Sequence, residues 1–224
     1  KNFKLFSINK LDYKMLSTND IIVIDIIESV LLKKKYKNVI KKFKKFCNII
    51  LIDNNFKKKW NLKYKIFPYL NFNKTSSRYC GQNYFIFDKK IINLVKKKDN
   101  KIKSNIVICM GGSDRYNLTY KVANELIASH INCKINLIIG PLYSSPKLQK
   151  INELKKRNSN VEIHKNPKKV YEIIRNNKLA IINSGNLKYE CALLGTPFVL
   201  YANTTKDIKS SINFSKKFKV FFQN

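Results

Sequence analysis

Short apolar segments alternate with amphipathic segments through the second half of the chain. Apolar runs rich in β-branched residues predict buried strands, and apolar residues three or four apart predict helices. The predicted strands are residues 105–110, 134–139, 161–164, 179–182 and 198–201, and the predicted helices are residues 117–129, 147–158, 167–176, 187–194 and 207–218. Strands that alternate with helices at this spacing indicate an α/β fold with a doubly wound parallel sheet.

The first half of the chain has a less regular pattern. Residues 21–26 and 48–53 predict buried strands that carry Asp25 and Asp53 toward their ends, and residues 29–46 predict a helix. Residues 57–69 have no clear period, residues 84–87 predict an aromatic strand and residues 91–98 a short helix. For both aspartates, capping of the following helix or turn is favoured over a role in lining a cleft.

A charged segment without apolar residues, 96–103, is the predicted linker between two domains. The expected domains are 1–97, a partial Rossmann-like domain, and 104–224, a nucleotide-sugar-binding domain. The chain starts without Met and without a strand-turn unit, and its tail stops on a predicted strand. We therefore expect a fragment.

The charge balance is strongly basic, with 45 Lys+Arg against 14 Asp+Glu and a net charge of +31. Such a charge indicates a nucleic-acid binder in many proteins. Here the lysines are spread along the chain, and Asn, Ile, Phe and Tyr are abundant too, which A/T-rich codons explain together. Arginine, the better reader of phosphate and guanine, is scarce. We favour a solvated basic surface that attracts anionic substrates, and keep nucleic-acid binding as the alternative.

The five cysteines are isolated, with no CxxC pair, which is typical of reduced thiols in a cytoplasmic protein. The longest apolar run, residues 21–32, is interrupted by Asp25 and Glu28, so we expect no membrane span and find no signal-peptide pattern. No cluster of acidic residues and histidines indicates a metal, and we expect no cofactor. His130 fits a helix C-terminal cap, and His164 fits a surface loop better than a cleft.

Two turns that follow predicted strands could hold phosphate. Gly111, Gly112 and Ser113 follow the strand 105–110 and precede a helix, although a plain tight turn explains them equally well. Ser184, Gly185 and Asn186 follow the strand 179–182, and Gly195 begins the turn after the next helix.

Two polar side chains accompany these turns. Glu190 lies one turn into the helix after the second turn, where a carboxylate could accept hydrogen bonds from a ribose diol; by itself a helix-dipole role is favoured. Asn203 follows the strand 198–201 and could contact a sugar or diphosphate, or belong to an ordinary loop.

In this order the motifs resemble those of GT-B glycosyltransferase-like proteins. The segments are GGSDRYNLT from Gly111, NSGNLKYECALLGTP from Asn183, and, in the first half, VIDIIES, LIDNNF and YCGQNYFIF. Within that superfamily the chain is most similar to the UDP-sugar hydrolases of the pseudaminic acid pathway, which release UDP and a free diacetamido-trideoxy sugar.

The resemblance implies two Rossmann-like domains, the first incomplete, and a UDP-sugar substrate. It implies that Gly112 and Ser113 lie near the diphosphate, that Ser184 to Asn186 contact diphosphate or sugar, and that Glu190 binds the ribose. The chain departs from the family in having Ser184-Gly185 in place of Gly-Gly. The family's glycine-rich loop with its histidine, which acts on water, has no match and would precede residue 1. A UDP-sugar hydrolase is therefore expected, with no catalytic residue assigned, and a glycosyltransferase on the same scaffold stays open.

Overall fold

A computed structural model gives the structure of the chain. It describes residues 12, 14, 16–25, 34–52, 62, 64–69, 79–97, 102–218 and 221–223. The chain forms two compact units, Lys1–Ile86 and Phe87–Asn224, which are treated separately below.

The first unit contains a parallel sheet in the order β1-β2-β3-β4. Its elements are β1 (Ile21–Asp25), α2 (Lys34–Phe43), β2 (Asn48–Ile52), β3 (Tyr64–Phe67), β4 (Tyr79–Cys80) and the 3-10 helix η2 (Gln82–Tyr84). Ile40 and Phe43 of α2 pack with Ile24, Ile49 and Leu51 in one apolar cluster. The two strands predicted from residues 21–26 and 48–53 are present and pair in parallel register.

Two expectations for this unit were wrong. Residues 57–69, expected to be irregular, contain β3, a four-residue strand that ends just before Pro68. Residues 84–87 are not a strand: Tyr84 ends η2, and the strand in this region is Tyr79–Cys80. The glycine at 81 has φ 107° and turns the chain out of β4 after two residues, so the aromatic run follows the strand. Asp25 is exposed at the end of β1, and Asp53 lies outside the described residues.

The second unit is built on a six-stranded sheet in the order β10-β9-β8-β5-β6-β7, with all neighbouring strands parallel. The strands are β5 (Ile106–Cys109), β6 (Ile135–Ile139), β7 (Val161–Lys165), β8 (Leu179–Asn183), β9 (Phe198–Tyr201) and β10 (Phe221–Gln223). The helices are α3 (Lys89–Val95), α4 (Leu118–Ala128), α5 (Ser145–Arg157), α6 (Val170–Arg175), α7 (Leu187–Leu194) and α8 (Thr205–Phe218). The predicted doubly wound parallel sheet is confirmed.

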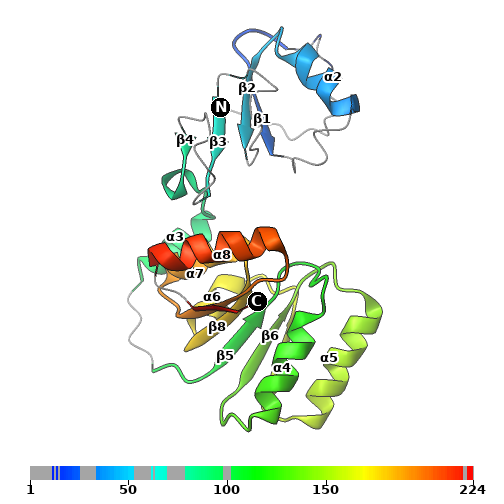
Figure 1. Ribbon diagram of the computed structural model, residues 1–224, viewed down its shortest axis with the longest axis vertical. Helices are drawn as coiled ribbons and strands as arrows, with labels where there is room; N and C mark the ends of the chain where they lie inside the picture. Colours follow the sequence, from blue (N-terminus) through cyan, green and yellow to red (C-terminus); the bar gives the residue numbers. More distant parts are fainter. Residues whose placement is uncertain are drawn as a thin grey trace. The chain divides into compact units, whose positions relative to one another are not determined.

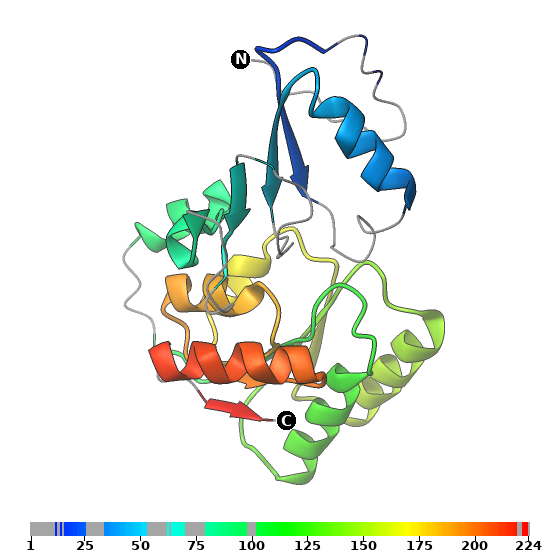
Figure 2. The same cartoon turned by 45° about the horizontal axis from the view of Figure 1, so that its top comes forward.

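The helices of the second unit form two layers (Figures 1 and 2). α4 and α5 lie together on one side of the sheet, and α6, α7 and α8 lie on the other. The burial of β5 explains this layering, because its residues are buried on both faces. Ile106 and Ile108 belong to the cluster that contains Val122 of α4 and Ile151 of α5. Val107 and Cys109 alternate with them and face the opposite layer.

The short helix α3 belongs to the second unit. It contacts α6 and α7, its residue Ile91 is fully buried, and Arg175 of α6 donates hydrogen bonds to the backbone carbonyls of Leu94 and Lys97. The division between the units therefore falls before Phe87, ahead of the charged segment 96–103 that the sequence analysis took as the linker.

Candidate nucleotide-sugar site

The strand order of the second unit reverses at β5. From β5 the chain moves outward through β6 and β7, then returns to β8 on the other side of β5 and continues to β9 and β10. In open α/β sheets this reversal leaves a crevice at the carboxyl ends of the two central strands, where ligands bind. The two candidate turns, Gly111–Ser113 and Ser184–Asn186, directly follow β5 and β8. They therefore flank the reversal point.

The Gly111–Ser113 turn is exposed to solvent, and the buried residue that follows it, Asp114, is hydrogen-bonded to α4. Gly111 adopts φ 85°, which favours glycine, and Gly112 and Ser113 are exposed. Asp114 is 3% exposed, and its carboxylate accepts hydrogen bonds from the backbone N–H groups of Leu118 and Thr119, both at 2.8 Å. A carboxylate of this protein thus caps the N-terminus of α4, so that end of the helix is already neutralised.

Two residues that the sequence analysis did not single out hold this turn in place. Lys147 of α5 donates from Nζ to the carbonyl oxygens of Ser113 at 3.2 Å and Asp114 at 2.6 Å. Gly140, after β6, lies so close to Gly112 that a Cβ on Gly140 would stand 2.4 Å from the Gly112 carbonyl oxygen. Only a three-dimensional contact identifies Gly140, because its sequence surroundings predict an ordinary turn.

The second turn presents its backbone and not its serine. The Ser184 hydroxyl is buried, donates to the Asp207 carbonyl at 3.2 Å and accepts from the Ser211 hydroxyl at 2.7 Å. Gly185 and Asn186 are exposed, and the Asn186 side chain makes no capping bond to α7. Two helices, α4 and α7, begin beside the reversal point. Among the described residues, an acidic side chain caps α4 and none caps α7.

Asn183, the last residue of β8, lies between the two turns. A Cβ built on Gly111 would stand 3.0 Å from its amide nitrogen, and one built on Gly185 would stand 3.4 Å from its amide oxygen. Glycine at both positions lets the Asn183 amide fit between them. The strand predicted from the sequence ends at residue 182, and Asn183 was named only as the first residue of the segment NSGNLKYECALLGTP. The available signal was a polar residue directly after an apolar run.

Glu190 lies in the first turn of α7 beside a small cavity. The Tyr171 hydroxyl of α6 donates a hydrogen bond of 3.0 Å to its Oε1 atom. Burial raises the pKa of Glu190, and the bond from Tyr171 opposes that rise. The cavity is about 250 Å³ and is lined by Glu190, Tyr171, Asp88, Lys90, Lys168 and Val170. A carboxylate has room for further donors beside Tyr171, because each oxygen can accept two hydrogen bonds.

Asn203 is exposed in the loop after β9, at the same sheet edge but one strand farther from the reversal point. The following residue caps α8: Thr204 Oγ1 accepts from the Asp207 backbone N–H at 3.1 Å and donates to the Asp207 carboxylate at 2.6 Å. Asn203 is thereby held at the start of a fixed helix.

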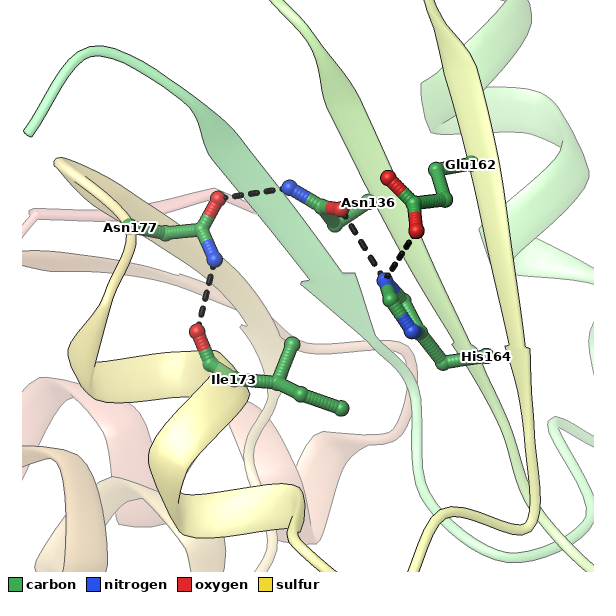
Figure 3. A network of polar contacts seen from close by, with 5 residues as sticks. All are labelled: Asn136, Glu162, His164, Ile173 and Asn177. Atoms are coloured by element: carbon green, nitrogen blue, oxygen red, sulfur yellow. Dashed lines mark hydrogen bonds and ion pairs between the residues drawn. The ribbon is translucent and has the colours of Figure 1, made fainter.

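His164 is not in a surface loop; it is part of β7 (Figure 3). Its Nε2 atom lies 3.0 Å from Oδ1 of Asn136 and 3.9 Å from Glu162, and Asn136 donates to Oδ1 of Asn177 at 2.8 Å. Asn177 in turn donates to the Ile173 carbonyl at the end of α6. This network joins β6 and β7 to the connection before β8, so His164 has a structural partner away from the two turns.

Within the described ranges, no three His, Cys, Asp or Glu side chains are grouped as a metal site would require. The helices in the same ranges include none with both the length and the apolar character needed to cross a membrane.

Comparison with known proteins gives partial matches. The model of the lipid-A-disaccharide synthetase family matches residues 141–207, which include the second turn, Glu190 and Asn203. "Uncharacterized protein MJ1062" of Methanocaldococcus jannaschii is 36% identical over 139 residues, 58% of this chain and 28% of that protein. The UDP-2,4-diacetamido-2,4,6-trideoxy-beta-L-altropyranose hydrolase of Campylobacter jejuni is 27% identical over 119 residues, 53% of this chain and 41% of the hydrolase.

The crystal structure of Acinetobacter baumannii MurG superposes with a TM-score of 0.51 at 13% identity, covering 79% of this chain and 53% of MurG. The fold is therefore an α/β fold with parallel sheets of the GT-B type. The matches span less than half the length of both curated relatives, and they connect the chain distantly to a UDP-sugar hydrolase.

Proposed function

We propose that the second unit binds the UDP part of a UDP-sugar at the carboxyl ends of β5 and β8. The observation that carries this proposal is the pair of glycine turns at the strand-order reversal, with the half-buried carboxylate of Glu190 beside the second turn. An exposed helix N-terminus favours phosphate, and a partly buried carboxylate favours the two hydroxyls of a ribose.

The two turns have different roles in this proposal. Because Asp114 already caps α4, the Gly111–Ser113 turn offers close backbone approach and the Ser113 hydroxyl, while α7 offers its free N–H groups and positive dipole end. The diphosphate would lie across Gly185 and Asn186, and the ribose hydroxyls would donate to Glu190, which Tyr171 orients. Asn203 would face the sugar side of the diphosphate.

For the reaction, we propose hydrolysis. Water would attack the anomeric carbon of the sugar, and the bond between that carbon and the β-phosphate oxygen would break. The proton lost by the water would pass to solvent, and UDP would leave with its charge neutralised at α7. The distant match to a hydrolase whose printed substrate is a UDP-sugar supports this choice. In this scheme the second unit holds the leaving group, and none of its residues is given the role of activating water.

The test is calorimetric titration of the full chain with UDP and with uridine. Glu190→Gln should weaken both ligands by about 10-fold, the value of one charge-assisted hydrogen bond. Glu125→Gln, at an exposed position of α4, is the matched control and should bind as the parent does. Equal affinities of the parent and Glu190→Gln would contradict the ribose role, and no binding of UDP by the parent would overturn the whole proposal.

Glycosyl transfer is the second candidate, because the family model that matches residues 141–207 describes a synthetase. The two reactions differ in their need for an acceptor. UDP release from a UDP-sugar that proceeds at the same rate with and without sugar acceptors supports hydrolysis, whereas release that depends on an acceptor supports transfer.

A further inference from the structure

Lys188 is a buried lysine in the first turn of α7, directly below the Ser184–Asn186 turn. Its side chain is 3% exposed. Nζ donates to the Ser184 carbonyl oxygen at 3.1 Å and to the Ser210 hydroxyl of α8 at 2.7 Å. Lysine is seldom buried to this degree, and a cation at a helix N-terminus opposes the helix dipole. Its two hydrogen bonds hold the ammonium in this position, although helix stability alone would not favour the charge there.

Among the described residues, the surroundings of Nζ are mainly neutral. The rings of Tyr189 and Phe214 lie 5.5 Å and 5.7 Å from it, and the Ser211 and Ser184 hydroxyls bond to each other beside it. Asp207 of α8 is the acidic group whose charge acts on Lys188, but its carboxylate is bonded to Thr204. Burial outweighs Asp207 and lowers the pKa of Lys188 to about 8.

We propose that Lys188 is a positioning residue for the diphosphate of a bound nucleotide. The buried ammonium of Lys188 fixes the Ser184–Asn186 turn to α8 and adds positive charge beneath that turn. The inference rests on the proposed function, because it concerns the same turn. It assigns a specific contribution: Lys188 discriminates ligands that carry phosphate from the nucleoside alone.

The physical reason is the weak neutralisation of the ammonium in the free protein. Carbonyl and hydroxyl oxygens satisfy its hydrogen bonds without cancelling its charge. In a poorly solvated position this charge attracts an anion placed on the other side of the turn more strongly than a surface lysine would. By linkage, the anion must in turn favour the charged form of Lys188.

The experiment compares UDP with uridine, which shares the base and ribose but has no phosphate. At pH 7, Lys188→Met should weaken UDP binding by about 10-fold and leave uridine binding within about 2-fold, since only the phosphate feels the lost charge. Lys209→Met removes an exposed lysine from α8 and is the matched control, with both affinities within about 2-fold of the parent. Lys188→Gln repeats the test with a polar side chain if the methionine variant does not fold.

The pH dependence gives a readout that a purely structural role would not. In the parent, the ratio of UDP to uridine affinity should fall between pH 7 and pH 9, as Lys188 loses its proton, and the ratio should stay level in Lys188→Met. In the parent protein with ¹³C-labelled lysine, UDP but not uridine should raise the pKa of Lys188 followed by NMR.

Equal losses for UDP and uridine in Lys188→Met, or a Lys188 pKa that UDP leaves unchanged, would overturn this inference while leaving the proposed function intact. If the parent binds neither ligand, both proposals are wrong.

Discussion

The Tyr171 hydroxyl orients the Glu190 carboxylate, the proposed ribose ligand. Its hydrogen bond to Glu190 fixes one oxygen and limits the rise in pKa that burial causes. Tyr171→Phe should raise the pKa of Glu190 further, free its rotation and weaken uridine binding about 3- to 10-fold, the value of one net hydrogen bond. Calorimetry at pH 7 measures this change.

A double-mutant cycle separates this role from a direct contact of Tyr171 with the ligand. If Tyr171 acts through Glu190, then Tyr171→Phe added to Glu190→Gln should cause little further loss. Additive losses in the double variant would show that Tyr171 contacts the ligand independently.

The lowered pKa of Lys188 predicts how the free energy of unfolding varies with pH. Its pKa is lowered in the folded protein, from 10.5 to about 8. Between these values the unfolded chain binds more protons, so the Lys188 contribution to the free energy of unfolding rises with pH across this window. Below pH 8 this shift corresponds to a net cost of about 3 kcal/mol for keeping Lys188 charged in the folded protein, relative to an unshifted lysine.

Denaturant unfolding of the parent and Lys188→Met at pH 7 and pH 10 tests this statement. The stability of the methionine variant relative to the parent should be greatest at pH 7 and decrease toward pH 10. A difference that stays constant with pH would mean that Lys188 titrates normally in the folded protein.

At the scale of the elements, the turn after β5 depends on the turn after β6. A methyl group on Gly140 would clash with the backbone of Gly112, whose carbonyl also accepts a bond from the Leu142 N–H at 2.9 Å. Gly140→Ala should therefore displace the Gly111–Ser113 turn and lower the free energy of unfolding by about 1 to 3 kcal/mol, as overpacking does. Thermal unfolding and UDP titration measure the two effects.

Gly112→Ala is the control for this substitution. No atom lies within 4 Å of a Cβ at Gly112, so alanine there should leave the stability within about 0.5 kcal/mol of the parent. Equal stability of Gly140→Ala and Gly112→Ala would contradict the close contact between Gly140 and the Gly112 backbone.

The sequence predicted elements well where apolar runs are long and bounded by turn residues. β5 and β8 are buried apolar strands, as predicted, and the turns that follow them lie at the reversal point. The alternation of strands and helices was enough to predict the doubly wound sheet. β3 was missed because a short strand next to Pro68 has no period of its own; its pairing with β2 creates it. Tertiary partners, not local pattern, decide such segments.

The side-chain arrangement around the candidate site could be predicted less completely, because distant residues set the direction of a side chain. Ser184 is of a residue type that often binds phosphate. Its hydroxyl is instead hydrogen-bonded to the Ser211 hydroxyl and the Asp207 carbonyl. Lys188 reads as one more surface lysine in a basic chain, and its burial depends on Phe214, 26 positions later in the sequence. Gly111 and Glu190 could be proposed from the sequence because turn geometry and helix position are local properties.

At the scale of the whole molecule, the sequence and the structure place the start of the second unit at different residues. The sequence predicts that this unit begins at residue 104, after the charged segment, whereas the contacts within the structure begin it at Phe87 and include α3. Because Asp88 and Lys90 line the cavity beside Glu190, the boundary also decides whether the candidate site is complete.

Two shortened chains, 87–224 and 104–224, distinguish these boundaries. Loss of α3 removes the fully buried Ile91 and uncovers the surfaces of α6 and α7 on which it packs. Burial of one isoleucine alone stabilises a protein by about 2 to 5 kcal/mol relative to its truncation, so 87–224 should unfold cooperatively at a clearly higher temperature than 104–224. Uridine binding should also be weaker in 104–224, because one wall of the cavity is missing. Equal melting temperatures and equal uridine affinities would place the boundary at the charged segment, and α3 would then belong functionally with the first unit.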